Sequence, residues 1–295
     1  MKKLLDKLKE GQVLLSDGAW GTMLFEKGLT AGECPELWNI TNRDKVFEIA
    51  QSYIKAGADI IETNSFGSSG IKLELFDLAD RAEEINIKAA EISRDAAGND
   101  HYVFGSIGPS GKILMMGDVT EEQLYKTFSR QSAALEKGGA DAIIIETITA
   151  LDEAMIAIRA AKENTGLPVV CTFTFDKTVN NDFRTMMGVS PTEMTENLIN
   201  SGVDIIGTNC GNGFDGMLEI VKEIRQTNAT IPLMVQANAG LPQLINGQSV
   251  FPESPDEMAA KLPLLIDLGV NTIGGCCGTT PKHIAKFAEV INNMP

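Results

Sequence analysis

Short apolar runs alternate along this chain with longer amphipathic segments. Runs rich in Val, Ile and Leu, without polar alternation, are typical of strands buried on both faces. Eight such strands are predicted, at residues 13–15, 59–62, 102–107, 142–146, 169–175, 204–208, 233–237 and 271–274. An apolar period of 3.6 predicts helices at 44–56, 79–97, 121–137, 151–164, 191–201, 214–226, 256–268 and 281–291, and a short leading helix within 1–11.

One phrase recurs where a helix gives way to a strand. It consists of Gly, a small residue and Asp or Asn, and it occurs at 57–59, 139–141, 202–204 and 269–271. Glycine there supplies a left-handed helix cap. At the other helix ends, N caps are expected at Asp44, Thr120 and Ser254, and Pro281 suits a first helical turn.

The repeated strand–helix unit predicts the architecture. Eight such units favour a single (β/α)8 TIM barrel of the α/β class, forming one domain over residues 1–295. A doubly wound open sheet is the alternative, but no Gly-x-Gly-x-x-Gly follows the first strand.

Composition narrows the possible partners. A hydrophobic content of 43% allows a sizeable core, whereas the net charge of −15 argues against nucleic acid or an anionic membrane surface. No apolar run approaches the roughly 18 residues of a membrane span, and the lysine-rich start lacks a signal peptide's apolar core. We therefore expect a cytoplasmic protein with reduced cysteines.

In a TIM barrel, reactive residues lie where strands run into the following loops. The unusual segments of this chain fall at such places: 17–22, 62–67, 105–109, 146–147, 209–210, 238–240 and 276–277. Seven loops of one rim could therefore surround a single pocket.

Three of the five cysteines are candidate metal ligands. Cys276 and Cys277 are adjacent and flanked by glycines, and Cys210 ends an earlier strand. Three thiolates without a companion histidine suit Zn²⁺ and leave one position for a substrate. Two small buried side chains or a vicinal disulfide are alternatives for the pair. Cys171 is expected in the core, and Cys34 is expected to be structural or incidental.

The remaining candidates are polar residues of the rim. Asp17 and Glu146 could be solvated or helix-capping carboxylates, or could bind the ammonium of an amino acid. The backbone of Gly18, Ala19, Gly21 and Thr22 could then receive its carboxylate, while Asn238 is either a turn residue or a pocket group. The two histidines, His101 and His283, are predicted to lie away from this chemistry.

The motifs together resemble those of a known family. In order they read Asp-Gly-Ala-x-Gly-Thr, Glu-Thr-Asn-Ser-Phe-Gly, Ile-Gly-Pro, Glu-Thr, Thr-Asn-Cys, Asn-Ala-Gly-Leu-Pro and Gly-Gly-Cys-Cys-Gly-Thr-Thr-Pro. This series is similar to the homocysteine S-methyltransferase family, and most similar to the homocysteine-binding barrel of its cobalamin-dependent methionine synthase branch. Two positions depart from the usual pattern: Ala237 stands where proline is usual, and Trp20 where a smaller residue is common.

The resemblance implies roles for the same residues. Cys210, Cys276 and Cys277 match three zinc ligands, with the sulfur of L-homocysteine as the fourth. Asp17 and Glu146 match positions that hold the substrate amine, the turn from Gly18 to Thr22 matches the carboxylate-binding segment, and Asn238 matches a residue near the zinc.

The same resemblance implies methionine formation from a methylcobalamin or methyl-corrinoid donor. That donor would be a separate corrinoid protein or downstream cobalamin and folate modules. S-methylmethionine and betaine are alternative donors. Alternatives of another class are a non-catalytic zinc- or thiol-binding module, and a redox protein that uses a Cys276–Cys277 disulfide.

Overall fold

Eight parallel strands close into a barrel in a computed structural model that describes residues 4–245 and 248–294. The sheet order is β1-β12-β9-β8-β5-β4-β3-β2, and a parallel bridge between Ser16 and Ile60 joins its two ends. The predicted (β/α)8 barrel and its strands are confirmed. They are β1 (Leu14–Leu15), β2 (Ile60–Glu62), β3 (Tyr102–Ile107), β4 (Ala142–Ile148), β5 (Val169–Phe173), β8 (Ile205–Asn209), β9 (Leu233–Ala237) and β12 (Thr272–Gly275).

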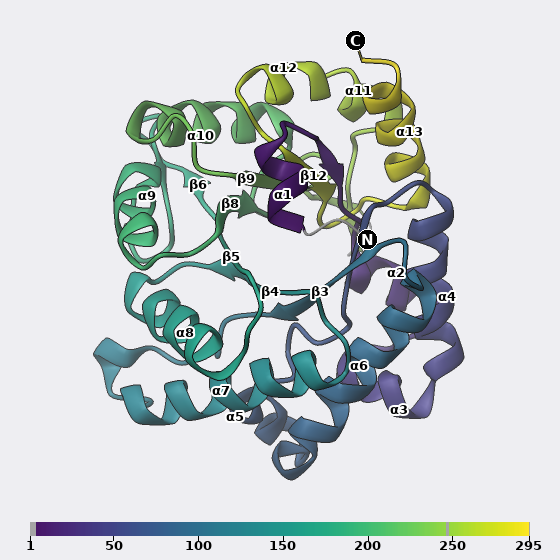
Figure 1. The fold of residues 1–295 in the computed structure, drawn as a ribbon, viewed down its shortest axis with the longest axis vertical. Helices are drawn as coiled ribbons and strands as arrows, with labels where there is room; N and C mark the ends of the chain where they lie inside the picture. Colours follow the sequence, from purple (N-terminus) through teal and green to yellow (C-terminus); the bar gives the residue numbers. More distant parts are fainter. Residues whose placement is uncertain (1–3, 246–247, 295) are drawn as a thin grey trace.

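Helices surround the barrel (Figure 1). Those predicted from the sequence are α1 (Leu4–Lys9), α4 (Arg43–Lys55), α6 (Ala82–Ala97), α7 (Glu121–Lys137), α8 (Leu151–Asn164), α9 (Pro191–Asn200), α10 (Phe214–Thr227) and α13 (Pro281–Asn292). None of the helices within the described ranges has the length and apolar content to cross a membrane.

Three expectations about helices are corrected. The single helix expected at 256–268 is two, α11 (Pro255–Ala259) and α12 (Leu262–Asp267). Pro263, near the start of α12, lacks the N–H that a continuous helix needs. The helix expected from residue 79 begins as a 3₁₀ turn, η3 (Ala79–Arg81). The N cap of α4 is Asn42 and not Asp44, whereas Thr120 and Ser254 form the predicted caps.

The recurring Gly-small-Asp/Asn phrase fastens the strands in pairs. Its glycines have φ values between 71° and 103°, as the left-handed cap requires. Its acidic or amide side chain then accepts the first free N–H of the neighbouring strand at 2.8–2.9 Å. The pairs are Asp59 with Leu15, Asp141 with Val103, Asp204 with Val169, and Asn271 with Leu233.

Side chains inside the barrel form an apolar plug at its amino-terminal end. The plug joins Leu4 and Leu8 of α1 to inward-facing residues of seven strands, Leu14, Ile60, Phe104, Ile144, Val170, Ile205 and Met234. Figure 1 shows α1 in front of the barrel, so this view faces the plugged end. The opening of the barrel therefore lies at the far end.

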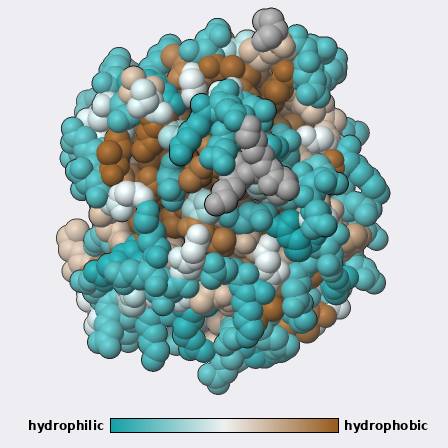
Figure 2. Space-filling view, viewed as in Figure 1, coloured by the Kyte–Doolittle hydropathy of each residue, from teal (hydrophilic) through white to brown (hydrophobic). Residues whose placement is uncertain are grey.

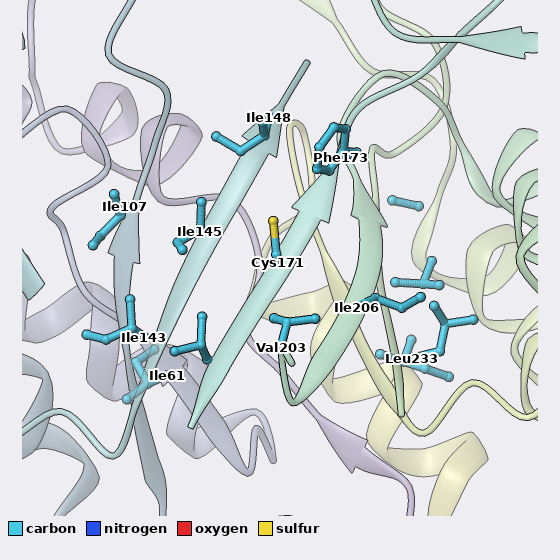
Figure 3. Packing of buried hydrophobic residues seen from close by; sticks show 14 of the residues in the cluster. Ile61, Ile107, Ile143, Ile145, Ile148, Cys171, Phe173, Val203, Ile206 and Leu233 are labelled. Atoms are coloured by element: carbon cyan, nitrogen blue, oxygen red, sulfur yellow. The ribbon is translucent and has the colours of Figure 1, made fainter. Parts of the chain in front are cut away.

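Outward-facing strand residues pack beneath the helices. Figure 3 shows Ile143, Ile145, Cys171, Phe173 and Ile206 side by side on neighbouring strands. Cys171 is fully buried, as predicted. On the plugged face, hydrophilic residues cover most of the surface, and apolar residues gather mainly in the half that carries α9, α10 and α12 (Figure 2).

Several short elements lie beyond the carboxyl ends of the strands. All of them except α2 fall where the sequence predicted no element. The helical ones are α2 (Trp20–Glu26), η1 (Pro35–Leu37), α3 (Trp38–Thr41), α5 (Gly70–Leu73), η2 (Glu74–Phe76) and η4 (Leu114–Met116). Two hairpins add β6 (Asp176–Lys177) with β7 (Phe183–Arg184), and β10 (Gln243–Ile245) with β11 (Gln248–Val250). The exception is α2, which replaces the turn expected at 18–22.

Candidate metal and substrate site

A cavity of about 310 Å³ opens at the carboxyl ends of the strands. Eight of the predicted site residues line it: Gly18, Ala19, Gly21, Thr22, Glu146, Cys210, Cys276 and Cys277. Asp17 and Asn238 do not line it. The cavity also contains residues to which the sequence assigned no role. Trp20, Glu62 and Ser106 belong to the predicted rim segments 17–22, 62–67 and 105–109, whereas Gln236 lies outside all of them.

Three cysteine sulfurs meet on one wall of this cavity. The Sγ atoms of Cys210 and Cys277 are 3.9 Å apart, and all three sulfurs lie within 4.8 Å of one another. A tetrahedral zinc–thiolate site with bonds of about 2.3 Å separates its sulfurs by about 3.8 Å. The spacing therefore fits a tetrahedral metal, and the cavity that the three cysteines line would give a fourth ligand access to it. Metal binding itself stays a prediction.

The backbone around the cysteines is held in unusual conformations. Cys210 has a φ of 58°, which is uncommon for a residue with a Cβ. Gly275 lies so close to Thr279 that a Cβ would approach its Oγ1 to 2.3 Å. That hydroxyl donates to the carbonyl of Cys276 at 2.7 Å and accepts the N–H of Ala19 at 3.1 Å. Thr279 thus fixes the cysteine pair to the loop after β1.

Hydrogen bonds among the three thiols shift their pKa values in opposite directions. Hydrogen bonds from Cys276 and Cys277 lower the pKa of Cys210 to about 3, and the Asn238 side chain contributes a further bond. Donation to Cys210 correspondingly raises the pKa of Cys277 to about 12 and that of Cys276 well above its ordinary value. A divalent cation would supply the charge needed to deprotonate all three.

Glu146 lies within a β-bulge of β4. The register with β5 shifts between Ile145 and Ile148, and Thr147 has a φ of 59°. Asn209 fills the irregularity: its Oδ1 accepts the N–H of Thr147 at 2.9 Å, and its Nδ2 donates to Glu146 at 3.1 Å. Bulges beside active sites commonly redirect a side chain in this way.

Glu146 is an unusually basic carboxylate. Burial raises its pKa to about 7, although a hydrogen bond from Ser106 opposes the shift. Repulsion from Asp17 and Cys210 adds to the increase.

Asp17 is fully buried behind the cavity lining. Its Oδ2 accepts the indole N–H of Trp20 and the backbone N–H of Glu62, both at 2.9 Å. Burial raises its pKa to about 7. Asp17 therefore does not line the cavity, and it acts on the lining through its hydrogen bonds to Trp20 and Glu62.

The floor of the cavity is a polar layer that follows from strand periodicity. Because side chains alternate between faces, the residue two places beyond each plug residue points into the barrel again. These residues include Glu62, Ser106, Glu146 and Gln236, which follow Ile60, Phe104, Ile144 and Met234. That alternation is the sequence signal that could have identified Glu62 and Gln236.

Glu62 and Gln236 are joined on this floor. Gln236 Nε2 donates to Glu62 Oε1 at 2.8 Å. Burial, and then repulsion from Glu146 and Asp17, raises the pKa of Glu62 well above its ordinary value. An accumulation of buried carboxyls with raised pKa values is favourable for a cationic ligand.

The segment expected to be a carboxylate-binding turn is partly helical. The N–H of Ala19 is already bonded to Thr279, and α2 begins at Trp20. The amides of Trp20, Gly21 and Thr22 lie in the first turn, where no helical carbonyl accepts them. These amides remain candidates for binding a carboxylate.

Comparison with known proteins identifies the family. The family model described as homocysteine S-methyltransferase matches residues 14–291. The chain belongs to the homocysteine S-methyltransferase family. It is 34% identical to the methionine synthase of Mycobacterium tuberculosis over 309 residues, and 33% identical to that of Mycobacterium leprae over 306. These alignments cover 99% and 98% of this chain but 25% of each relative, so the chain spans about a quarter of their length.

Solved structures of the family share the barrel. The metallated form of the homocysteine methyltransferase MmuM from Escherichia coli matches with a TM-score of 0.79 at 23% identity, covering 96% of this chain and 98% of that one. Its oxidized form matches with a TM-score of 0.77 at 24% identity, covering 97% and 98%. At these identities the likeness shows the fold.

Proposed function

We propose that this barrel methylates L-homocysteine to methionine and that Cys210, Cys276 and Cys277 hold the Zn²⁺ ion required. The observation that carries the proposal is the meeting of three sulfurs, at the spacing of a tetrahedral site, on the wall of a cavity. Family membership and the similarity to methionine synthases support the choice of thiol and product.

The substrate would enter with its sulfur toward the cysteines. Bound zinc supplies Lewis acidity, which makes a coordinated thiol, with a free pKa of about 8.5, almost wholly thiolate at neutral pH. Glu146 would accept hydrogen bonds from the ammonium group, and the backbone N–H groups from Trp20 to Thr22 would donate to the carboxylate. Asn238, whose side chain donates to Cys210, would orient that ligand. Because thiolate ligands require reduced cysteines, we place the protein in the cytoplasm.

A methyl-corrinoid donor, as methylcobalamin or bound to a corrinoid protein or module, is the proposed methyl source. Support comes from the segments between each barrel strand and the main helix that follows it, which form the rim at the open end. They carry twelve of the thirteen large apolar side chains exposed among the described residues. These side chains are Phe25, Leu75, Phe76, Ile113, Met115, Met116, Val179, Met186, Met187, Leu241, Leu244 and Val250. Such a concentration is typical of a surface that meets another protein.

A small cationic donor is the second candidate. Among the described residues that line the cavity, Glu36, Glu62 and Glu146 carry carboxyls, Trp20 and Phe66 are aromatic, and no Lys, Arg or His is present. An acidic, aromatic lining favours a sulfonium or quaternary ammonium group such as that of S-methylmethionine or betaine.

Metal content and turnover together test the proposal. Zinc would be measured in the wild type and in Cys210→Ala, Cys276→Ala and Cys277→Ala, and methionine formation would be followed with methylcobalamin, S-methylmethionine and betaine in turn. We expect each variant to fold, to lose zinc and to lose all turnover. Retention of zinc and activity in any variant would refute the ligand set, and turnover with betaine alone would refute the corrinoid donor.

The same samples test the functions of other classes. A non-catalytic zinc module would bind zinc and show no turnover with any donor. A redox protein would undergo reversible two-electron oxidation of the cysteine pair in the absence of metal. Either result would replace methyl transfer as the function.

A further inference from the structure

The floor of the cavity contains a hydrogen-bond acceptor that the protein leaves unused. Gln236 is 2% exposed and lines the cavity, yet its Oε1 has no partner among the described residues. Buried polar atoms are nearly always hydrogen bonded, so an orphan on a cavity floor indicates a ligand that donates to it.

The nitrogen of the same amide has a partner. Its Nε2 donates to Glu62 Oε1, so the amide group has a defined orientation with its oxygen directed elsewhere. Glu62 comes from β2 and Gln236 from β9, and Glu146 of β4 lines the same cavity. Three acceptor groups thus reach one floor from three strands.

We propose that Gln236 and Glu62 bind the ammonium group of the amino-acid substrate together with Glu146. An ammonium group has three N–H donors and a positive charge. Two carboxylates and one amide oxygen would match the three donors, and the charge would offset the burial of the acids. The inference rests on the proposed function, and it adds two residues to the binding site without altering the zinc ligands.

Two ligands that differ only in the amine distinguish a role in ammonium binding from a purely structural role of Gln236 and Glu62. L-homocysteine and 4-sulfanylbutanoate share the thiol and the carboxylate, and only the former has the amine. Binding of each would be measured by calorimetry on zinc-loaded protein. In cobalt-substituted protein, the absorption of the cobalt–thiolate bond would show whether the sulfur reaches the metal.

Gln236→Met keeps the length of the side chain and removes both polar atoms. We expect its Kd for homocysteine to rise about 10- to 100-fold, the loss that accompanies a hydrogen bond to a charged group. Its Kd for 4-sulfanylbutanoate should change less than about twofold. Glu62→Gln should show the same selectivity, and it replaces Gln236→Met if that variant fails to fold.

Thr272→Val is the matched control. Thr272 Oγ1 is another buried acceptor without a partner among the described residues, inside the same barrel but not on the cavity. Its substitution should leave both Kd values unchanged.

Equal weakening of both thiols by Gln236→Met and Glu62→Gln, or weakening of neither, would overturn the inference. If wild-type protein bound homocysteine without a cobalt–sulfur signal, the proposed function would fail, and this inference with it. If the wild type showed the cobalt–sulfur signal but both variants weakened the two ligands equally, the proposed function would stand. Only the role of Gln236 and Glu62 in ammonium binding would be refuted.

Discussion

Three parts of the candidate site are each held by a hydrogen-bonded neighbour. Asn209 holds Glu146, Gln236 holds Glu62, and Thr279 holds the loop that carries Cys276. Such supports keep buried polar groups satisfied and limit their movement. Substitutions of the supporting residues should therefore affect ligand binding, even at Asn209 and Thr279, which do not line the cavity.

Glu146 should make the unfolding of the metal-free protein dependent on pH. Its pKa is raised to about 7, whereas a glutamate in an unfolded chain titrates near 4.3. Between these values the folded protein keeps a proton that the unfolded chain has lost, so the free energy of unfolding should fall as pH rises from about 4.5 to about 7. In Glu146→Gln that fall should be smaller by on the order of 2–3 kcal/mol. Parallel curves from urea denaturation of the two proteins would contradict this assignment.

Asp17 and Glu146 should differ in their effect on substrate. Glu146 lines the cavity, whereas Asp17 is bonded to Trp20 and Glu62 behind the lining. Glu146→Gln should weaken homocysteine binding about 10-fold or more, and Asp17→Asn by less, with zinc content unchanged in both. Calorimetry on zinc-loaded protein measures this. A larger loss in Asp17→Asn would place that carboxyl in direct contact with the amine.

The sequence alone could indicate site residues whose residue type and spacing point to a particular chemistry. Two adjacent cysteines between glycines indicate a metal site without a structure. Glu62 and Gln236 could not be recognised in this way, because their position depends on which strand face closes inward. The contact of Asp17 with Trp20 was equally hidden, since it depends on a side-chain orientation in α2.

At the scale of elements, the barrel strands were predictable because both faces of each are buried. Their apolar runs are continuous, so eight of eight appear where expected. The hairpins β6–β7 and β10–β11 have short and partly polar strands, which carry no clear period. The segment from 18 to 22 was predicted to be a turn because it is rich in glycine, yet α2 begins within it at Trp20.

The bulge in β4 gives a prediction about a single amide. Asn209→Ala would leave the N–H of Thr147 and the carboxyl of Glu146 without this partner in a buried place. We expect the free energy of unfolding to fall by about 2–4 kcal/mol, as urea denaturation would show. Asn164→Ala is the control, because this exposed amide should cost less than about 1 kcal/mol. Equal losses in the two variants would show that the bulge does not depend on Asn209.

At the scale of the whole molecule, the two ends of the barrel have different tasks. The plugged end contains α1 and the apolar interior, and the open end contains the cavity, the cysteines and the exposed apolar rim. Substitutions on the rim should therefore slow methyl transfer from a corrinoid protein without affecting transfer from a small free donor.

Met115 and Met116 are 80% and 73% exposed on this rim. Replacing both with Ser should lower turnover with a methyl-corrinoid protein about tenfold at limiting donor, because apolar contact area is lost. Turnover with S-methylmethionine, zinc content and thermal stability should not change. Leu264→Ser, at an exposed apolar residue of α12 outside the rim, is the control. Equal rates in the control and the double variant would exclude this part of the rim as a docking surface.

The apolar plug beneath the polar floor has a consequence for the sequence of events in one turnover. Because the plug closes the amino-terminal end of the barrel, substrate and product reach and leave the floor through the open end. A bulky methyl carrier docked on the rim would cover that opening. The amino acid must then arrive before the carrier, and its methylated form can depart only after the carrier has left. Initial-rate patterns should accordingly be those of a compulsory-order mechanism, and random addition would show that a second route to the floor exists.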